Sequence, residues 1–240
     1  PVQYKLLQVL KGNKEFIILP SDKKLGPAIL NREFYMEKVL TEHLLTKAYH
    51  HMPPPEATKY LRETKNNLQS LYRHHKAKLG IAERQYFERS FTESHRNPMF
   101  YIVPKVQKEP IKYRPVVSCV NSFNAIFSTW LDFKMKQLLH CIPTYLKDSN
   151  DILKDLAALP KLPATARLFT ADATAMYTNI DTATALEAFN FLFVHYKTEI
   201  PENFPKEFFL KALEIVMNQN LFQFDDTFWL QLDGTAMGTP

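Results

Sequence analysis

The sequence predicts an α+β fold, and three observations support that prediction. Short runs rich in β-branched and aromatic residues occur near the start, the middle and the end of the chain, as expected of strands. Longer stretches between them carry apolar residues three and four positions apart, which is typical of amphipathic helices. Two of the strand-like runs are followed closely by a second run, as in antiparallel hairpins. We therefore expect an antiparallel sheet with helices packed on it.

The elements of the first half follow from local patterns. Apolar β-rich runs mark the strands, and Gly26-Pro27 marks a turn. Asn31 is expected to cap the first helix, and the prolines at 53–55 are expected to end that unit, because consecutive prolines cannot continue a helix. The predicted elements in order are a strand at 15–19, a helix at 31–47, a helix at 57–79, and strands at 100–103 and 113–119.

The second half is predicted to contain three further helices, one strand and a hairpin. Ser122 is expected to cap a helix that buries Trp130 and Phe133. The strand is expected to end at Asp172, and its alternation places Leu168 and Asp172 on the same face. The predicted elements in order are a helix at 122–140, a strand at 165–172, helices that follow Asp181 and Pro205, and a hairpin at 221–232 that turns at Asp225-Asp226.

The composition is that of a globular protein, since 45% of the 240 residues are apolar. Charges interrupt the longest apolar stretches well short of the roughly 18 residues that a membrane span needs, and the first residues lack the pattern of a secretion signal. We therefore expect a soluble protein that is not secreted and has no membrane partner. Cys119 and Cys141 have no His or Cys partner at metal-ligand spacing, and we expect buried thiols rather than a zinc site or a disulfide.

Charge is distributed unevenly along the chain. Residues 1–120 contain 21 lysines and arginines against 11 aspartates and glutamates, a net charge of +10. Residues 121–240 contain 9 against 14, a net charge of −5. A basic first half and an acidic second half suit a region that binds a polyanion, joined to a region that holds metal cations. An uneven solvated surface is the alternative explanation.

The stretch LFTADATAMYTNID (168–181) contains the first candidate site. An aspartate at the carboxyl end of a strand is a typical ligand of Mg²⁺, and the small residues after Asp172 leave room for a nucleotide to approach the backbone. The ring of Tyr177 would then lie under the sugar and exclude a 2′-hydroxyl, which selects deoxynucleotides. The alternative is that Asp172 is a turn or N-cap residue and Tyr177 a core residue.

Two further segments offer contacts for a nucleotide. In YRPVVS, Arg114 begins a strand after a loop that contains three lysines, and its guanidinium can hold a triphosphate through two parallel hydrogen bonds. A surface salt bridge is the alternative role for this arginine. In GTAMGTP, Gly234 and Gly238 lie close together, as expected where a base or nucleotide passes near the backbone. An ordinary turn after the hairpin is the alternative there.

The order of these segments resembles that of a known family. The succession DKKLGPA, FYIVPKVQK, YRPVVS, TADATAMYTNID and GTAMGTP is similar to the fingers and palm of reverse transcriptases, most closely those of Penelope-like retroelements, which are related to telomerase catalytic subunits. The similarity spans nearly the whole chain. It implies a right-hand polymerase fold, with basic fingers in residues 1–120 and the fingers-palm helix and a partial palm in residues 121–240.

The resemblance also implies an activity. Reverse transcriptases extend a DNA primer on an RNA template with deoxynucleoside triphosphates, using two Mg²⁺ (or Mn²⁺) ions. The implied metal-binding and catalytic residue is Asp172, the implied sugar gate is Tyr177, and the implied nucleotide contacts are Arg114, Lys105, Gly234 and Gly238. The implied nucleic-acid contacts are Lys23, Lys24, Lys108 and Lys112. An intracellular enzyme is expected, and the nucleus is compatible with a retroelement protein.

The sequence departs from the family pattern in two ways. Many reverse transcriptases have glutamine where this chain has Gly234, a pattern closer to the Penelope-like branch. The family's next motif, a tyrosine and a small residue followed by paired aspartates, is not reached before Pro240, and Asp225-Asp226 is a poor substitute at a predicted hairpin tip. We therefore expect a fragment of a polymerase, inactive alone. The competing hypothesis is a non-catalytic nucleic-acid-binding relic of such an element. The oligomeric state is left open.

Overall fold

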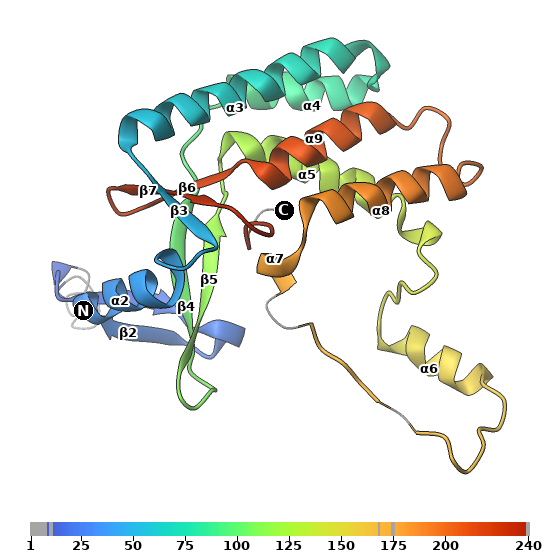
Figure 1. Ribbon diagram of the computed structural model, residues 1–240, viewed down its shortest axis with the longest axis horizontal. Helices are drawn as coiled ribbons and strands as arrows, with labels where there is room; N and C mark the ends of the chain where they lie inside the picture. The colour runs from blue at the N-terminus through green and yellow to red at the C-terminus, as the bar shows by residue number, and fades with distance from the viewer. Residues whose placement is uncertain (1–8, 10–11, 168, 174–175, 239–240) are drawn as a thin grey trace, which may run out of the picture.

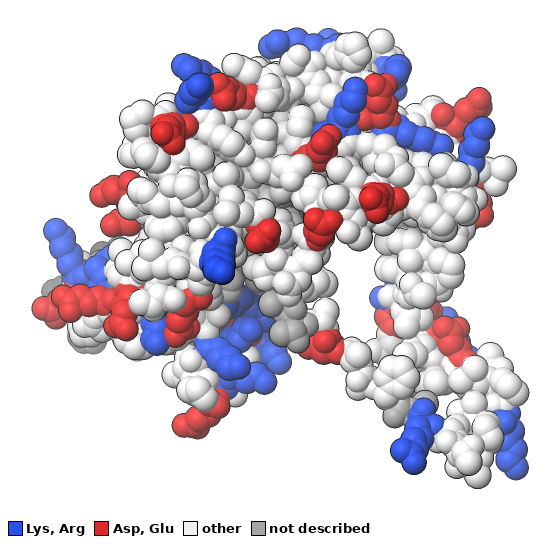
Figure 2. Space-filling model, in the orientation of Figure 1, with Lys and Arg blue, Asp and Glu red and all other residues white. Residues whose placement is uncertain are grey.

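The computed structural model describes residues 9, 12–167, 169–173 and 176–238. Its fold is α+β, as predicted (Figure 1). A layer of helices lies along one side of a five-stranded sheet, and a small two-stranded sheet with one helix lies below it. Residues 142–173 leave this body as an extended arm that carries one short helix, and Figure 2 shows an opening between the arm and the body. None of the described helices combines the length and the apolar composition needed to cross a lipid bilayer.

The five-stranded sheet joins the two halves of the sequence. Its strands, in spatial order, are β3 (Tyr49–Met52), β7 (Thr227–Gln231), β6 (Asn220–Phe224), β4 (Met99–Lys105) and β5 (Lys112–Ser118). Three of the four neighbouring pairs are antiparallel, whereas β4 and β6 pair in parallel at Met99 and Gln223. The predicted hairpin turn at Asp225-Asp226 is confirmed, since Phe224 pairs with Thr227 across it.

The small sheet and its helix cover one face of the larger sheet. The elements are β1 (Phe16–Pro20), the 3₁₀ turn η1 (Asp22–Lys24), β2 (Pro27–Asn31), α2 (Arg32–Val39) and the π-helical turn η2 (Leu40–Leu44). Asn31 caps α2 as predicted, because its Oδ1 accepts a hydrogen bond from the Phe34 N–H at 3.1 Å. Tyr35 and Val39 are buried against Ile102 of β4. The helix ends short of the predicted Lys47, because the chain then turns into β3, a strand that the sequence pattern does not reveal.

The helical layer has a core of aromatic side chains. Its elements are α3 (Pro54–His75), η3 (Lys76–Lys78), α4 (Ile81–Thr92), α5 (Phe123–Lys136), η4 (Leu139–Cys141), α8 (Thr182–His195) and α9 (Lys206–Asn218). Phe87, Phe127 and Phe208 are nearly inaccessible to solvent, and their rings contact one another. α4 is not evident from the sequence. α3 begins at Pro54 rather than at Ala57, since the first turn of a helix does not need proline N–H groups.

One residue predicted for this core lies outside it. Ser122 caps α5 as expected, and Trp130 is 3% exposed, but Phe133 is 56% exposed. The inward position is taken by Lys134, whose Nζ lies 3.0 Å from the Glu83 carboxylate of α4. The same carboxylate accepts a hydrogen bond from the Trp130 indole N–H at 2.9 Å. Because the Glu83 carboxylate pairs with the lysine and also accepts the Trp130 hydrogen bond, burial of the lysine is tolerable. α5 therefore turns Lys134 rather than Phe133 toward the core.

The predicted strand ending at Asp172 is wrong for the described residues. Residues 159–167 and 169–173 of the arm form no ladder, and Phe169 is 92% exposed; Leu168 lies outside the described residues. A strand needs a neighbouring strand to pair its backbone groups, and none is placed beside this segment in the described part of the chain. The arm instead contains α6 (Ser149–Ala158), which has no buried residue, and returns to the body at the short helix α7 (Met176–Asn179).

Candidate functional site

A cleft of about 610 Å³ lies where the sheet, α7 and the loop after β7 meet. Four of the residues predicted for nucleotide binding and catalysis line it, namely Lys105, Arg114, Asp172 and Tyr177. They come from β4, from β5, from the end of the arm and from α7, so the fold brings together residues up to 72 positions apart in the sequence. Tyr49, Phe100 and Tyr113 add aromatic surface to the same wall.

Asp172 and Tyr177 form the arm side of the cleft. Asp172 is exposed, and Tyr177 is 40% exposed, so Tyr177 is not a core residue. The N-cap role in this stretch belongs to Asp181, whose carboxylate accepts hydrogen bonds from the backbone N–H and the hydroxyl of Thr184 at 2.7 and 2.8 Å. These hydrogen bonds lower the pKa of Asp181. Asp181 therefore stabilises α8, and Asp172 faces the cleft.

Arg114 forms the opposite side, and it is partly engaged by an acid. Its Nη2 donates to Oδ2 of Asp22 at 3.4 Å, and its Nε lies 3.3 Å from Oδ1. Gln107 donates to the same Oδ2 at 3.2 Å. This ion pair attaches η1 to β5, so the salt bridge considered as an alternative is present. A guanidinium has five N–H donors, and the pair with Asp22 leaves some of them for a ligand in the cleft.

Lysines gather beside Arg114 on the β4–β5 hairpin and on η1. Figure 2 shows blue side chains grouped where these two elements meet. Lys105 and Lys112 are directly opposite each other in the antiparallel ladder. Like charges in that position repel, so an anion bound between them would stabilise the pair. We call the following residues the basic rim: Lys23, Lys24, Lys105, Lys108, Lys112 and Arg114.

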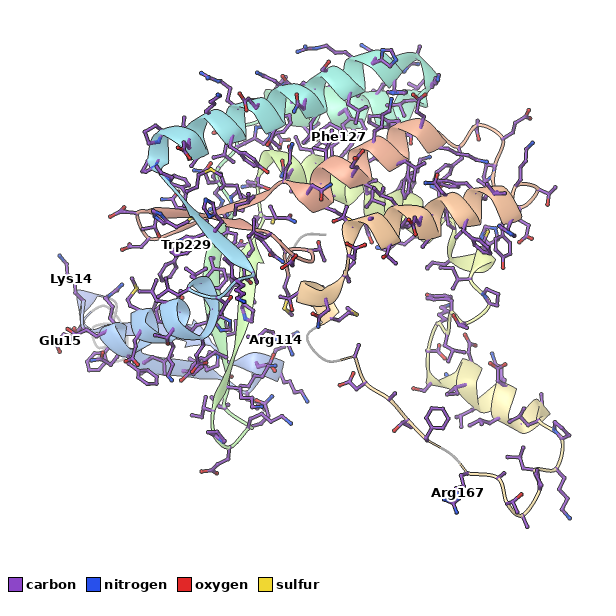
Figure 3. The ribbon with its side chains drawn as sticks, viewed as in Figure 1. Lys14, Glu15, Arg114, Phe127, Arg167 and Trp229 are labelled. Atoms are coloured by element: carbon purple, nitrogen blue, oxygen red, sulfur yellow. The ribbon has the colours of Figure 1, made fainter. Side chains whose placement is uncertain are left out.

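Other basic residues do not join this group. Figure 3 shows Arg114 at the edge of the sheet that faces the arm, whereas Arg167 lies far out on the arm. The same view places Phe127 in the helical layer and Trp229 in the sheet, away from the basic rim. Part of the positive charge of the first half thus lies next to the cleft, and further lysines and arginines of that half lie on α3, η3 and α4.

The two glycines of GTAMG hold the loop after β7 against its neighbours. Gly234 (φ +74°) lies so near α7 that an added Cβ would overlap the carbonyl oxygen of Tyr177. Gly238 (φ +116°) approaches the carbonyl oxygen of Val117 in the same way. Both positions therefore require glycine for protein packing. Neither glycine lines the cleft, although a nucleotide contact was predicted for both.

Two of the residues between the two glycines, Thr235 and Met237, do line the cleft. Thr235 donates its backbone N–H to the Tyr177 carbonyl at 2.7 Å, and the Met237 carbonyl accepts from the Val117 N–H at 2.7 Å. The loop therefore connects α7 to β5 and closes the cleft from behind. Tyr49 and Gln231, which pair across β3 and β7, were also not predicted. The contribution of Tyr49 depends on β3, which the sequence pattern gave no sign of, whereas Gln231 belongs to the predicted hairpin.

Asp172 is the acidic residue among the described residues that line the cleft. A carboxylate of this kind suits Mg²⁺, which is commonly held by one or two carboxylates and completed by substrate phosphates and water. The described wall thus fits one such ion and does not supply the acids of a two-ion site. Asp225 and Asp226 are exposed at the β6–β7 turn and do not line the cleft.

No protein-family model matches the chain, and neither the curated proteins nor the solved structures include one that is significantly similar to it. The functional interpretation therefore depends on the residues of the cleft and on the charge beside it. Together, the cleft and the basic residues beside it suit an anionic ligand that lies near an aromatic surface and near one carboxylate able to bind a metal ion.

Proposed function

We propose that the chain is the nucleotide- and template-binding part of an RNA-directed DNA polymerase, similar to the reverse transcriptases of Penelope-like retroelements. The proposed architecture is the right-hand fold, with fingers formed by the small sheet and the β4–β5 hairpin and a partial palm formed by the C-terminal elements. The observation that carries the proposal is the single cleft in which Lys105, Arg114, Asp172 and Tyr177 meet.

Each of these residues has a distinct role in the proposal. Lys105 and the free donors of Arg114 bind the triphosphate of the incoming deoxynucleotide. Tyr177 packs beneath the sugar, where its ring leaves no volume for a 2′-hydroxyl. Asp172 would hold Mg²⁺ or Mn²⁺, which when bound activates the attacking hydroxyl and stabilises the leaving pyrophosphate.

The basic rim provides the second part of the proposed function. In the proposal, Lys23, Lys24, Lys108 and Lys112 of the basic rim contact the phosphates of an RNA template and a DNA primer. Because phosphate contacts release counterions, the affinity for a primer–template should fall steeply as salt rises. Lys105 and Arg114 belong to both the basic rim and the cleft, so a template strand bound at the basic rim would lie next to the bound nucleotide.

A non-catalytic nucleic-acid-binding protein is the second candidate. The observation in its favour is that the described cleft wall contains one carboxylate, whereas the two-ion chemistry of polymerases uses more. Such a protein would bind a primer–template through the basic rim and would have no preference for any nucleotide.

Formation of a ternary complex separates the two candidates. A labelled DNA primer annealed to an RNA template is bound to the protein, and its dissociation rate is measured with Mg²⁺ and each nucleotide in turn. The polymerase proposal predicts that the complementary deoxynucleotide slows dissociation. Asp172→Asn should reduce this slowing by about tenfold or more, because a charge-assisted contact is lost. Asp226→Asn, which changes an exposed acid away from the cleft, is the matched control. Dissociation that no nucleotide alters would leave the nucleic-acid-binding protein as the function.

The same assay tests the sugar gate. Tyr177→Val should reduce the preference for the deoxynucleotide over the matching ribonucleotide, because removal of the ring frees volume for the 2′-hydroxyl. The comparison is a ratio within one preparation, so a loss of folded protein cancels. Tyr145→Val, a change at a similarly exposed tyrosine of the arm, should leave the ratio as it is in the wild type. An unchanged ratio in Tyr177→Val would remove the gate from the proposal.

A further inference from the structure

A second group of chemically distinctive side chains lies at the far end of α8 from the cleft. It consists of His140 and Cys141 in η4 and Glu199 in the turn after α8. One ligand atom from each lies within 4.8 Å of the others, and the Cys141 Sγ is 3.4 Å from the His140 Nε2. The fourteen residues of α8 rise by about 20 Å, so this cluster is separate from the cleft.

The geometry of the cluster is close to that of a zinc site. Ligands at 2.0–2.3 Å from a tetrahedral ion are about 3.5 Å from one another, which is near the observed separation of the sulfur and the nitrogen. The Cys141 side chain is 2% exposed and fixed by its surroundings, whereas His140 and Glu199 are exposed and free to rotate inward. Small side-chain rotations of the two exposed residues would therefore place the three ligand atoms at three corners of a tetrahedron around one ion.

The donor set also indicates which class of metal would bind. A thiolate and an imidazole favour Zn²⁺ and similar transition metals, whereas Mg²⁺ prefers oxygen donors. The site would thus not compete with Asp172 for the same ion. Burial and the neighbouring Glu199 carboxylate both raise the pKa of the Cys141 thiol, so the thiol stays protonated without a cation. Binding of a divalent cation would release that proton to solvent and form the thiolate.

A contact without metal is the competing explanation. The His140 Nε2 also lies 3.4 Å from the Glu199 carbonyl oxygen, at a distance and position that suit a weak hydrogen bond between η4 and the turn after α8. That contact accounts for the approach of the histidine. It does not account for a buried thiol and an exposed carboxylate converging on the same ring nitrogen.

We propose that His140, Cys141 and Glu199 bind one Zn²⁺ ion, with a water molecule in the fourth position. The ion would join η4 to the turn between α8 and α9. Because Ile142 begins the arm directly after Cys141, the ion would also fix the base of the arm on the helical layer. This site is independent of the proposed polymerase function, and it can exist whether or not the cleft binds nucleotides.

Cobalt substitution tests the proposal on the full chain. Co²⁺ is added to chelator-treated protein, and the near-ultraviolet band of a thiolate bound to Co²⁺ is recorded; Zn²⁺ should then remove it by displacement. Cys141→Ser should abolish the band. Glu199→Gln and His140→Gln should weaken Co²⁺ and Zn²⁺ binding by at least about tenfold. Loss of a residue that only hydrogen-bonds to a metal ligand already weakens metal binding by about that factor, and loss of a ligand should weaken it at least as much.

Matched variants distinguish the site from adventitious binding. Cys119→Ser changes the other buried cysteine, and Glu202→Gln changes a nearby exposed acid; both should bind Co²⁺ as the wild type does. Zn²⁺ should also raise the Tm of the wild type and of these controls, but not that of Glu199→Gln. Because His140 and Glu199 are exposed, their variants will fold even if Cys141→Ser does not. The proposal is overturned if the wild type shows no thiolate band, or if the band survives in Glu199→Gln and His140→Gln at unchanged affinity.

Discussion

The helical body and the arm both contain large apolar side chains, but these are buried in the body and exposed in the arm. In the body, Phe87 and Phe127 lie with ring centroids 4.9 Å apart, and both are fully buried. In the arm, Leu153 is 61% exposed and Phe169 is 92% exposed. Apolar side chains stabilise a fold only where another surface removes them from water. The body therefore has a defined core, whereas α6 and the residues after it have apolar surface that the described chain does not cover.

This difference matters because the cleft lies between the two regions. Lys105 and Arg114 belong to the sheet, and Asp172 belongs to the end of the arm. One connection between them is the contact of the GTAMG loop with α7, in which Thr235 donates to the Tyr177 carbonyl. Ile180, directly after α7, also packs against the helical core. The acid thus lies in an unpaired segment that is held from its C-terminal side, whereas the cations lie on a paired sheet.

The largest expected effect is on the core of the body. Phe127→Ala should lower the free energy of unfolding by about 3–5 kcal/mol, because it removes a fully buried ring and leaves a cavity. Phe169→Ala makes the same chemical change in the arm and should cost less than about 0.5 kcal/mol. Chemical denaturation of the two variants measures both values. A similar loss for Phe169→Ala would mean that the arm is packed in solution, and the contrast between the two regions would be lost.

A smaller effect is expected where the arm joins the body. Gly234→Ala should cost about 2 kcal/mol, because the residue has a positive φ and its Cβ would overlap the backbone of α7. Gly26→Ala is the matched control, since Gly26 also has a positive φ but has open space around it. The cost of Gly234→Ala in denaturation should exceed that of Gly26→Ala, and it should be accompanied by weaker nucleotide binding. Equal costs would show that φ alone matters and that the loop does not press on α7.

The smallest expected effect concerns a polar side chain inside the body. His75 is 1% exposed, and burial lowers its pKa below the ordinary value, although Glu207 at 3.9 Å acts in the opposite direction. The unfolded chain therefore binds a proton at a higher pH than the folded chain does. The stability that results is fully present above about pH 6.5 and is lost as the pH falls below it towards the folded pKa.

A substitution isolates this contribution. His75→Phe keeps the ring next to Phe208 and removes the titrating group, so unfolding free energy should fall less between about pH 7 and about pH 5 than it does in the wild type. His195→Gln, a change at an exposed histidine, should leave the pH dependence as it is. If His75→Phe has the wild-type pH dependence, His75 is not held neutral by the fold.

Local patterns were sufficient for much of the fold. The caps at Asn31 and Ser122, the β6–β7 turn and the β4–β5 pair follow from short-range chemistry, because a cap or a turn is decided by a few neighbouring residues. β3 was missed because it spans four residues, and α4 because its pattern is weakly amphipathic; α6 was missed although its spacing is amphipathic. Among the cleft residues, Tyr49 was missed with β3, whereas Gln231 lies in the predicted hairpin and was not singled out as a site residue.

The sequence by itself determined the α+β class and the basic first half, because these depend on composition and on local spacing, whereas the four residues that line the cleft were expected from their chemistry and from the resemblance to reverse transcriptases. The tertiary structure decided which side chains are buried and which meet. It placed Lys134 inside rather than Phe133, because Glu83 from another helix neutralises the lysine. It left the described residues 159–167 and 169–173 without a strand and brought His140, Cys141 and Glu199 together. Pairing and burial depend on partners distant in the sequence, and local spacing carries no information about such partners.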